Sequence, residues 1–188
     1  MADLARSPVT LPATAPGWLE QIQIRPLTAE ELPALEWEGA FAHFRRVYDQ
    51  AFARARRGNG LIWVAGQENG RLLGQIFVLL CSVYDPALAD GRRQALIHSF
   101  RVRPELRGAG LGTRLLAHTE GDLARRGFQR VILNVARANP AAIRLYERNG
   151  YRKVGKDEGR WSYLDHQGIE RHVHEPGWRM CKDFLNQG

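Results

Sequence analysis

The sequence has 188 residues, of which 44% are hydrophobic and 25% are charged. These shares are ordinary for a soluble globular protein, and the length suits one domain with a sizeable core. The formal net charge of +7 comes mostly from arginine. Because the arginine pairs are dispersed along the chain rather than gathered in one stripe with aromatic residues, the pattern argues against nucleic acid as a partner.

Two further features argue against secretion and against a membrane protein. No basic segment followed by an apolar core opens the chain, and no uninterrupted apolar run of about 18 residues occurs anywhere. The two cysteines, Cys81 and Cys181, show no metal-ligand spacing. We therefore expect both to be reduced packing residues in a cytoplasmic protein.

The amino-terminal part of the chain predicts a tail, a strand and a helix start. Prolines and a glycine among small residues indicate a flexible tail over residues 1–18, followed by one domain over residues 19–188. Period-two alternation in Gln21–Pro26 predicts a first strand. The pair Thr28 and Glu31 forms a capping box and predicts a helix that starts there.

An aromatic stripe marks a second helical region, which begins near Glu38. Its members recur at three- and four-residue steps: Phe41, Phe44, Tyr48 and Phe52. We interpret this stripe mainly as core packing.

Turn residues then separate a hairpin from a further strand. Leu61–Ala65 and Leu72–Val83 predict two antiparallel strands joined by a turn at Glu68–Gly70. A surface loop over Asp85–Arg93 leads to a strand over Ala95–Val102. Strict alternation along this strand predicts one face with His98, Phe100 and Val102 and another with Ile97, Ser99 and Arg101.

The rest of the chain predicts two helices among short strands. Leucines four residues apart indicate a helix from Leu111 to Gly127, and the apolar run Val131–Leu133 indicates a central strand. Asn139 caps a helix that Pro140 opens and Gly150 ends. The remaining segments predict late strands over Tyr151–Val154, Gly159–Leu164 and His174–Phe184, with a loop over Asp165–Glu175.

Three glycines in five positions lie between the strand that ends at Val102 and the helix that starts at Leu111. Such a loop turns sharply and leaves backbone N–H groups open to an anion, which the helix dipole also favours. A Walker-type loop needs a lysine before Thr113, and a dinucleotide fingerprint starting at Gly108 needs glycine in place of Thr113. The remaining pattern, Arg-x-x-Gly-x-Gly, is filled by Arg107, Gly110 and Gly112.

This loop resembles the pyrophosphate loop of the GNAT superfamily, the acyl-CoA-dependent N-acyltransferases. A second segment resembles the closing part of GNAT domains, with the pattern N-x-x-A-x-x-L-Y-x-x-x-G-F/Y. Its places are filled by Asn139, Ala142, Leu145, Tyr146, Gly150 and Tyr151. Two matched segments in the right order carry more weight than one glycine loop.

The resemblance implies an α/β fold in which a mixed sheet is flanked by helices. Antiparallel amino-terminal strands would be followed by parallel strands four and five, splayed around acetyl-CoA. The pantetheine arm would pair with the backbone of strand four, and the pyrophosphate would rest on the glycine loop. The expected cofactor contacts are Phe100, Arg101, Val102, Arg107, Gly108, Ala109, Gly110, Leu111, Gly112, Thr113, Asn134, Asn139, Ala142 and Tyr146.

The resemblance also implies the reaction, which is transfer of an acetyl group from acetyl-CoA to a primary amine by direct attack in a ternary complex. Tyr146 stands where the family's general acid usually stands, and a phenol with a pKa near 10 can protonate a thiolate. His98 occupies the strand position where many members carry a glutamate base. The choice of general base stays open between His98, Glu36, Glu38 and water.

The sequence leaves the acceptor open among small molecules, peptides and proteins, and it does not decide whether the acyl group is longer than acetyl. The alternatives to an enzyme are a CoA-binding module without turnover and an arginine-rich protein associated with RNA or ribosomes. A homodimer is one possible assembly. Three histidines, His166, His172 and His174, suggest a metal site, but no carboxylate or cysteine completes a ligand motif, so we expect no metal.

Overall fold

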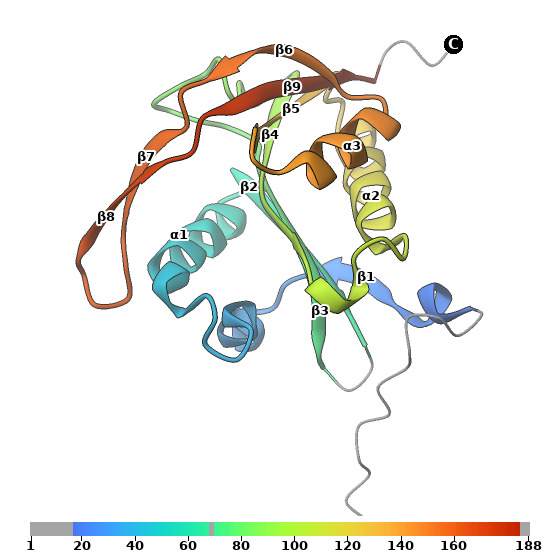
Figure 1. The fold of residues 1–188 in the computed structure, drawn as a ribbon, viewed down its shortest axis with the longest axis vertical. Coiled ribbons are helices and arrows are strands. Elements are labelled where there is room, and N and C mark those ends of the chain that lie inside the picture. Colours follow the sequence, from blue (N-terminus) through green and yellow to red (C-terminus); the bar gives the residue numbers. More distant parts are fainter. Residues whose placement is uncertain (1–16, 68–69, 185–188) are drawn as a thin grey trace, which may run out of the picture.

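The computed structural model of the chain describes residues 17–67 and 70–184 (Figure 1). Residues 1–16, which make up most of the predicted tail, lie outside the described residues. Trp18, at the end of that predicted tail, begins a short 3-10 helix, Trp18–Gln21, and is buried in the core.

The described residues form a seven-stranded sheet with the order β1-β2-β3-β4-β5-β9-β6. The strands are β1 Gln23–Pro26, β2 Gly60–Gly66, β3 Leu72–Leu79, β4 Gln94–Val102, β5 Arg130–Ala136, β6 Arg152–Asp157 and β9 Gly177–Asp183. Neighbouring strands run antiparallel except β4 and β5, which run parallel. This topology confirms the predicted mixed sheet with parallel strands four and five.

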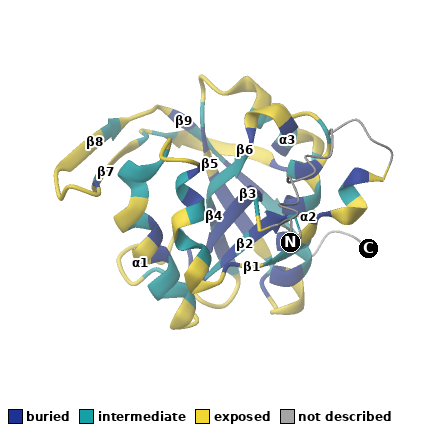
Figure 2. Cartoon of the chain, turned by 90° about the horizontal axis from the view of Figure 1, so that it is seen from below, coloured by how far each residue is buried: buried dark blue, intermediate teal, exposed yellow. Residues whose placement is uncertain are grey.

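Helices cover both faces of this sheet (Figures 1 and 2). Helix α1, Arg45–Arg56, packs on one face, and helices α2, Leu111–Arg125, and α3, Pro140–Arg148, pack on the other. The alternation of β2 and β3 explains the two layers of core, because successive side chains of a strand point to opposite faces. On β2, Val64 belongs to the α1 layer and Ala65 to the α2 layer.

None of the helices described is both long and apolar enough to cross a membrane.

The two amino-terminal helix predictions need correction. Ala29–Glu36 is a 3-10 helix, which is consistent with Pro33 inside it, because proline has no N–H to donate in an α-helix. The predicted cap does form, since the Thr28 N–H donates to the Glu31 carboxylate at 3.1 Å.

The helix predicted from Glu38 starts later, at Arg45. Trp37, Glu38 and Gly39 have φ angles of 47°, 57° and 92°. This left-handed run cannot continue a right-handed helix. A short 3-10 turn, Ala42–Phe44, then leads into α1.

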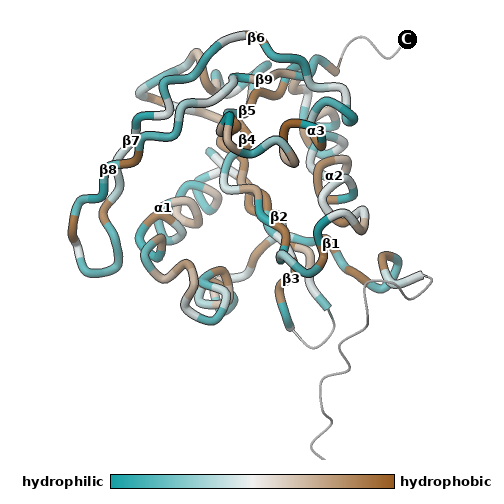
Figure 3. The backbone as a smooth tube through the Cα atoms, in the orientation of Figure 1, coloured by the Kyte–Doolittle hydropathy of each residue, from teal (hydrophilic) through white to brown (hydrophobic). Residues whose placement is uncertain are grey.

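The predicted loop Asp165–Glu175 is also wrong in part, because it contains strand β8, Glu170–His174. This strand pairs with β7, Arg160–Leu164, in a separate two-stranded sheet that extends toward α1 (Figure 1). Asp165 makes the turn, since its carboxylate accepts hydrogen bonds from the N–H groups of Gln167 and Ile169. The hairpin is largely hydrophilic, unlike β4 and β5, so it lacks a strong apolar signal (Figure 3).

Candidate active site

The candidate site lies where β4 and β5 part. The two strands pair from Gln94 opposite Arg130 to Ile97 opposite Leu133, but both continue beyond this point. The end of β4 is therefore not paired with β5, and its backbone can pair with an extended ligand instead. This is the region that the sequence assigned to the pantetheine arm.

A β-bulge changes the direction of the side chains at the end of β4. Gln75 of β3 lies opposite Arg101, and Phe77 lies opposite His98, so β4 carries one residue more than β3 between these pairs. Ser99 has a φ of 49°, which is left-handed and uncommon for a residue other than glycine.

Because of this bulge, the predicted shared face of His98, Phe100 and Val102 is wrong. Phe100 and Val102 pack with the core under α2 and α3. His98 instead lies on the α1 side, where its ring centroid is 5.6 Å from that of Phe77. Arg101 points to the same side and donates a hydrogen bond to the Tyr48 hydroxyl at 2.6 Å.

The glycine loop joins β4 to α2. Gly108 and Gly110 have φ angles of 80° and 93°, which glycine adopts without steric strain. Arg114 N donates to Gly110 O at 3.0 Å, which is the first bond of the helical series. The N–H groups of the first turn have no acceptor within the helix, so this end of α2 is suited to an anion.

Gly112 brings the loop close to β4 and α3. A Cβ at this position would lie 3.4 Å from Leu145, 3.7 Å from Phe100 and 3.8 Å from Val102. The close packing brings the two segments that the sequence singled out, the glycine loop and α3, into one region. Ala109 and Ala142 are partly buried against the same core, whereas Thr113 is exposed.

Three of the predicted contact residues already have protein partners. The Arg107 Nε donates to the Val102 carbonyl at 3.2 Å. The Asn139 Oδ1 accepts from the Ala142 N–H at 3.1 Å, which confirms the predicted helix cap. Asn134 is exposed on β5, and its Oδ1 accepts from the Arg179 Nε at 3.3 Å.

Tyr146 lies on α3, and its ring packs near those of Phe100 at 6.3 Å and Tyr151 at 5.6 Å between centroids. Only 7% of the residue is exposed. Burial raises the pKa of the Tyr146 phenol well above its usual value. The hydroxyl is protonated at neutral pH, as an unperturbed phenol is, and the raised pKa makes it a weaker acid than was expected from the sequence.

His98 is neutral at neutral pH. Burial, and then the nearby guanidinium groups of Arg54 and Arg101, lower its pKa to about 4. Its Nδ1 lies 3.2 Å from the Ser99 Oγ. His98 and Tyr146 approach from the α1 side and the α3 side, so a group held between β4 and β5 would have one of them on each side.

The two alternative bases are held in ion pairs. Glu36 accepts hydrogen bonds of 2.6 and 2.9 Å from Arg45. Glu38 accepts hydrogen bonds of 2.9 and 2.8 Å from Arg103. These bonds lower the pKa of both carboxyl groups, which makes each a weaker base than a free glutamate. His98, whose pKa is lowered as well, differs from them in having no ion-pair partner in the described part of the chain.

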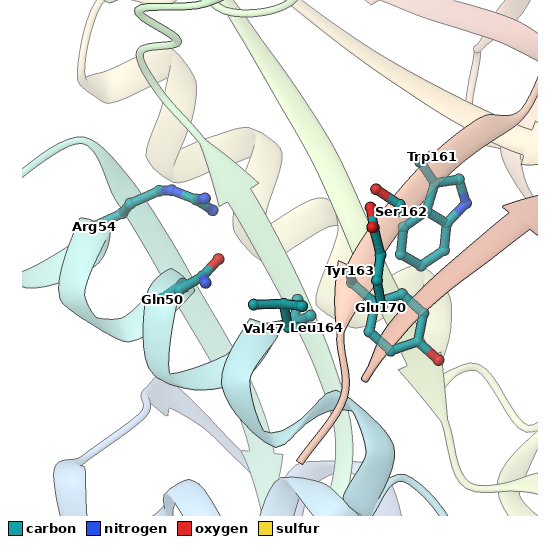
Figure 4. A pocket seen from close by; sticks show the side chains of 8 residues that line it. All are labelled: Val47, Gln50, Arg54, Trp161, Ser162, Tyr163, Leu164 and Glu170. Carbon is teal, nitrogen blue, oxygen red and sulfur yellow. The ribbon is translucent and has the colours of Figure 1, made fainter. Parts of the chain in front are cut away.

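A cavity of about 370 Å³ lies on the α1 side, between α1 and the β7–β8 hairpin (Figure 4). Its lining residues are Val47, Gln50, Arg54, Trp161, Ser162, Tyr163, Leu164 and Glu170. This cavity was not predicted from the sequence. The available signal was the spacing of Val47, Gln50 and Arg54, which places them on one helix face.

The described residues contain no group of three or more His, Cys, Asp or Glu side chains that could hold a metal ion. His172 and His174 lie on β8, and the His172 Nε2 is 4.0 Å from Glu170. Cys81 and Cys181 are free.

Comparison with known proteins gives a family and several relatives. Residues 23–151 match the family described as Acetyltransferase (GNAT) family. An L-methionine sulfoximine/L-methionine sulfone acetyltransferase of Salmonella typhimurium is 29% identical over 130 residues, which cover 66% of this chain and 73% of that protein. The protein of the same name from Pseudomonas paraeruginosa is 32% identical over 115 residues, which cover 58% of this chain and 63% of that protein.

Solved structures show the same fold. A chimera of the Vibrio cholerae spermidine N-acetyltransferase SpeG and hSSAT has a TM-score of 0.65 at 17% identity, over 89% of this chain and 99% of that chain. The ribosomal-protein-S18-alanine N-acetyltransferase from Escherichia coli has a TM-score of 0.62 at 23% identity, over 89% and 96% of the two chains. A PaiA N-acetyltransferase from Thermoplasma acidophilum, in complex with coenzyme A, has a TM-score of 0.63 at 19% identity, over 87% and 99%.

Proposed function

The chain belongs to the GNAT acetyltransferase family, and we propose that it acetylates a primary amine by direct attack in a ternary complex with acetyl-CoA. As a member of this family it is an acyl-CoA-dependent N-acyltransferase that uses acetyl-CoA as donor. The observation that carries the proposed mechanism is the position of Tyr146 and His98 on opposite sides of the point where β4 and β5 part.

The residues present fit the donor. The first-turn N–H groups of α2 suit the pyrophosphate, and the left-handed Gly108 and Gly110 place no side chain at their two positions of the loop. The part of β4 beyond Ile97 offers backbone groups to the amides of the pantetheine arm. When bound, acetyl-CoA supplies the activated acetyl group.

In the proposed reaction a proton is accepted on one side of β4 and donated on the other. His98, neutral on the α1 side, accepts a proton from the attacking amine, directly or through a water. Tyr146, protonated on the α3 side, donates a proton to the departing thiolate. Direct attack needs no acyl-enzyme, and neither Cys81 nor Cys181 lies among the residues of the site.

The proposal is tested by incubating the protein with acetyl-CoA and a panel of primary amines while free thiol is measured. The relatives are named for amino-acid derivatives and a polyamine, so the panel includes both kinds of amine. We expect thiol release that depends on both substrates, with intersecting double-reciprocal plots. Parallel plots would contradict direct attack. CoA binding without thiol release for any amine would instead favour a CoA-binding module.

A further inference from the structure

We infer that the acceptor carries a carboxylate, as a free amino acid does, and that Arg54 binds this carboxylate in the cavity between α1 and the β7–β8 hairpin. This inference rests on the proposed function, because it concerns the second substrate of the same reaction. It is carried by the position of the cavity and by the charges around it.

The cavity lies on the side of the sheet to which His98 points. Arg54 and Gln50 extend from α1 toward the hairpin, and Trp161, Tyr163 and Glu170 lie on the opposite wall (Figure 4). The charge of Arg54 contributes to the lowered pKa of His98, so the guanidinium is electrostatically close to the proposed base. An acceptor held by Arg54 therefore lies on the side from which the amine would attack.

Arg54 forms no ion pair in the part of the chain that the structure describes, although Glu170 lines the same cavity. Arg101 is similar. Its guanidinium lies over the rings of Phe41 at 4.2 Å and Phe44 at 4.9 Å, and it donates to the Tyr48 hydroxyl rather than to a carboxylate. Two guanidinium groups without an ion pair on the α1 side of the sheet favour an anionic ligand there.

The carboxylates near these groups do not favour a polycation. Glu36 and Glu38 are held by Arg45 and Arg103, and Asp165 is held by Arg171. Glu170 lines the cavity, but its side chain is 56% exposed to solvent. One exposed carboxylate in a cavity that Arg54 also lines would attract a polyamine weakly, since the guanidinium repels a second cation at the same site.

The size of the cavity also suits a small acceptor. Its volume of about 370 Å³ is near the lower end of the range for small-molecule sites, about 300–1,000 Å³. Val47, Leu164 and Trp161 give it apolar surface for an amino-acid side chain. A bidentate contact from Arg54 to the carboxylate would then fix the orientation of the α-amine.

The experiment compares a set of L-amino acids with their carboxamides, and with spermidine, by release of free thiol. Removing the carboxylate leaves Arg54 without its partner, so we expect kcat/KM to be about 10- to 100-fold higher for the best acid than for its amide. In Arg54→Gln the ratio of kcat/KM for the acid to kcat/KM for the amide should fall toward one, mainly because KM for the acid rises. Arg56→Gln, an exposed arginine on the same helix, should keep the original ratio.

A second measurement does not depend on turnover. In the presence of CoA, the best amino acid should raise the melting temperature of the protein and its amide should not, and Arg54→Gln should abolish the rise. Equal use of acid and amide, preference for spermidine, or an unchanged ratio in Arg54→Gln would overturn the inference while leaving the proposed function intact. A strong loss in Glu170→Gln together with normal behaviour of Arg54→Gln would point to a cationic acceptor instead.

Discussion

At Tyr146 the ring and the hydroxyl can be tested separately. The ring packs beside Phe100 and Tyr151, and Tyr146→Phe retains that packing while it removes the proton donor. General acid assistance is typically about 10²–10⁴-fold, so we expect kcat to fall by about that factor. CoA affinity and melting temperature should change little.

The matched control is Tyr151→Phe, which removes a neighbouring hydroxyl and should leave kcat within about twofold, because no proton transfer is assigned to it. Retention of most activity in Tyr146→Phe would make this residue a packing residue only.

His98 should make the stability of the fold depend on pH in one direction. Its pKa is about 4 in the folded chain, lowered by burial and by Arg54 and Arg101, and about 6.5 when unfolded. Between these two pKa values the unfolded chain binds more protons than the folded chain, so the free energy of unfolding rises with pH. The contribution of His98 to stability is therefore lost as the pH falls toward 4. We expect His98→Gln to reduce this slope in denaturant titrations between pH 4 and 6.5. The control is His172→Gln on the exposed β8 strand. An unchanged slope in His98→Gln would show that His98 is not buried in its neutral form.

Residue-level prediction from the sequence succeeded where the interaction is local. The Asn139 cap and the Thr28–Glu31 contact join residues three apart, and both were predicted. The partners of charged residues were not predicted, because Arg103 binds Glu38 from 65 positions away. That ion pair is what weakens Glu38 as a candidate base.

At the level of the strand, the bulge at Ser99 sets which side chains face the acceptor side. A left-handed conformation costs an L-residue roughly 1–2 kcal/mol, and a β-branched residue tolerates it least. Ser99→Val should therefore lower the free energy of unfolding by about 1–2 kcal/mol. Ser99→Gly should leave it unchanged or raise it by up to about 1 kcal/mol, since relief of strain offsets the greater entropy of the unfolded chain. Chemical denaturation of both variants checks the prediction. Equal stability of the two would argue against a left-handed residue at this position.

The same bulge shows why the elements were predicted better than the faces they present. Period-two alternation located β4 but assumed one residue opposite each partner, so His98 was placed with Phe100 rather than with Arg101. A bulge depends on how β4 pairs with β3, so the residue types along β4 alone do not reveal it. Strand β7 was predicted, but β8 and its pairing with β7 were missed, since most side chains of β8 are exposed and carry no apolar alternation.

In the whole molecule, the sheet separates two sets of candidate site residues. The α2–α3 side holds the glycine loop and Tyr146, and the α1 side holds His98, the unpaired arginines and the cavity. The proposed donor residues could be named from the sequence because their motifs are continuous in it. The acceptor side could not, because its residues come from α1, β4 and the hairpin, which only folding brings together.

The donor site gives a prediction for the stability of the whole protein. Binding of CoA to the folded chain alone should raise the melting temperature without magnesium, by a stabilisation of about 2.7 kcal/mol at a hundredfold excess over Kd. Gly110 has a φ of 93° at the start of α2, where the phosphate is expected. Gly110→Asp adds a negative charge there and should abolish the CoA-dependent shift. Gly110→Asn adds nearly the same volume without the charge, and asparagine tolerates left-handed backbone, so this variant should keep part of the shift. Both variants gain a Cβ close to Leu19 Cδ1, at 3.1 Å, and should lose similar stability without ligand.

Because the two variants differ by one charge, loss of the CoA-dependent shift in Gly110→Asp alone would place the anion at this loop. Equal shifts in both variants would place the anion elsewhere.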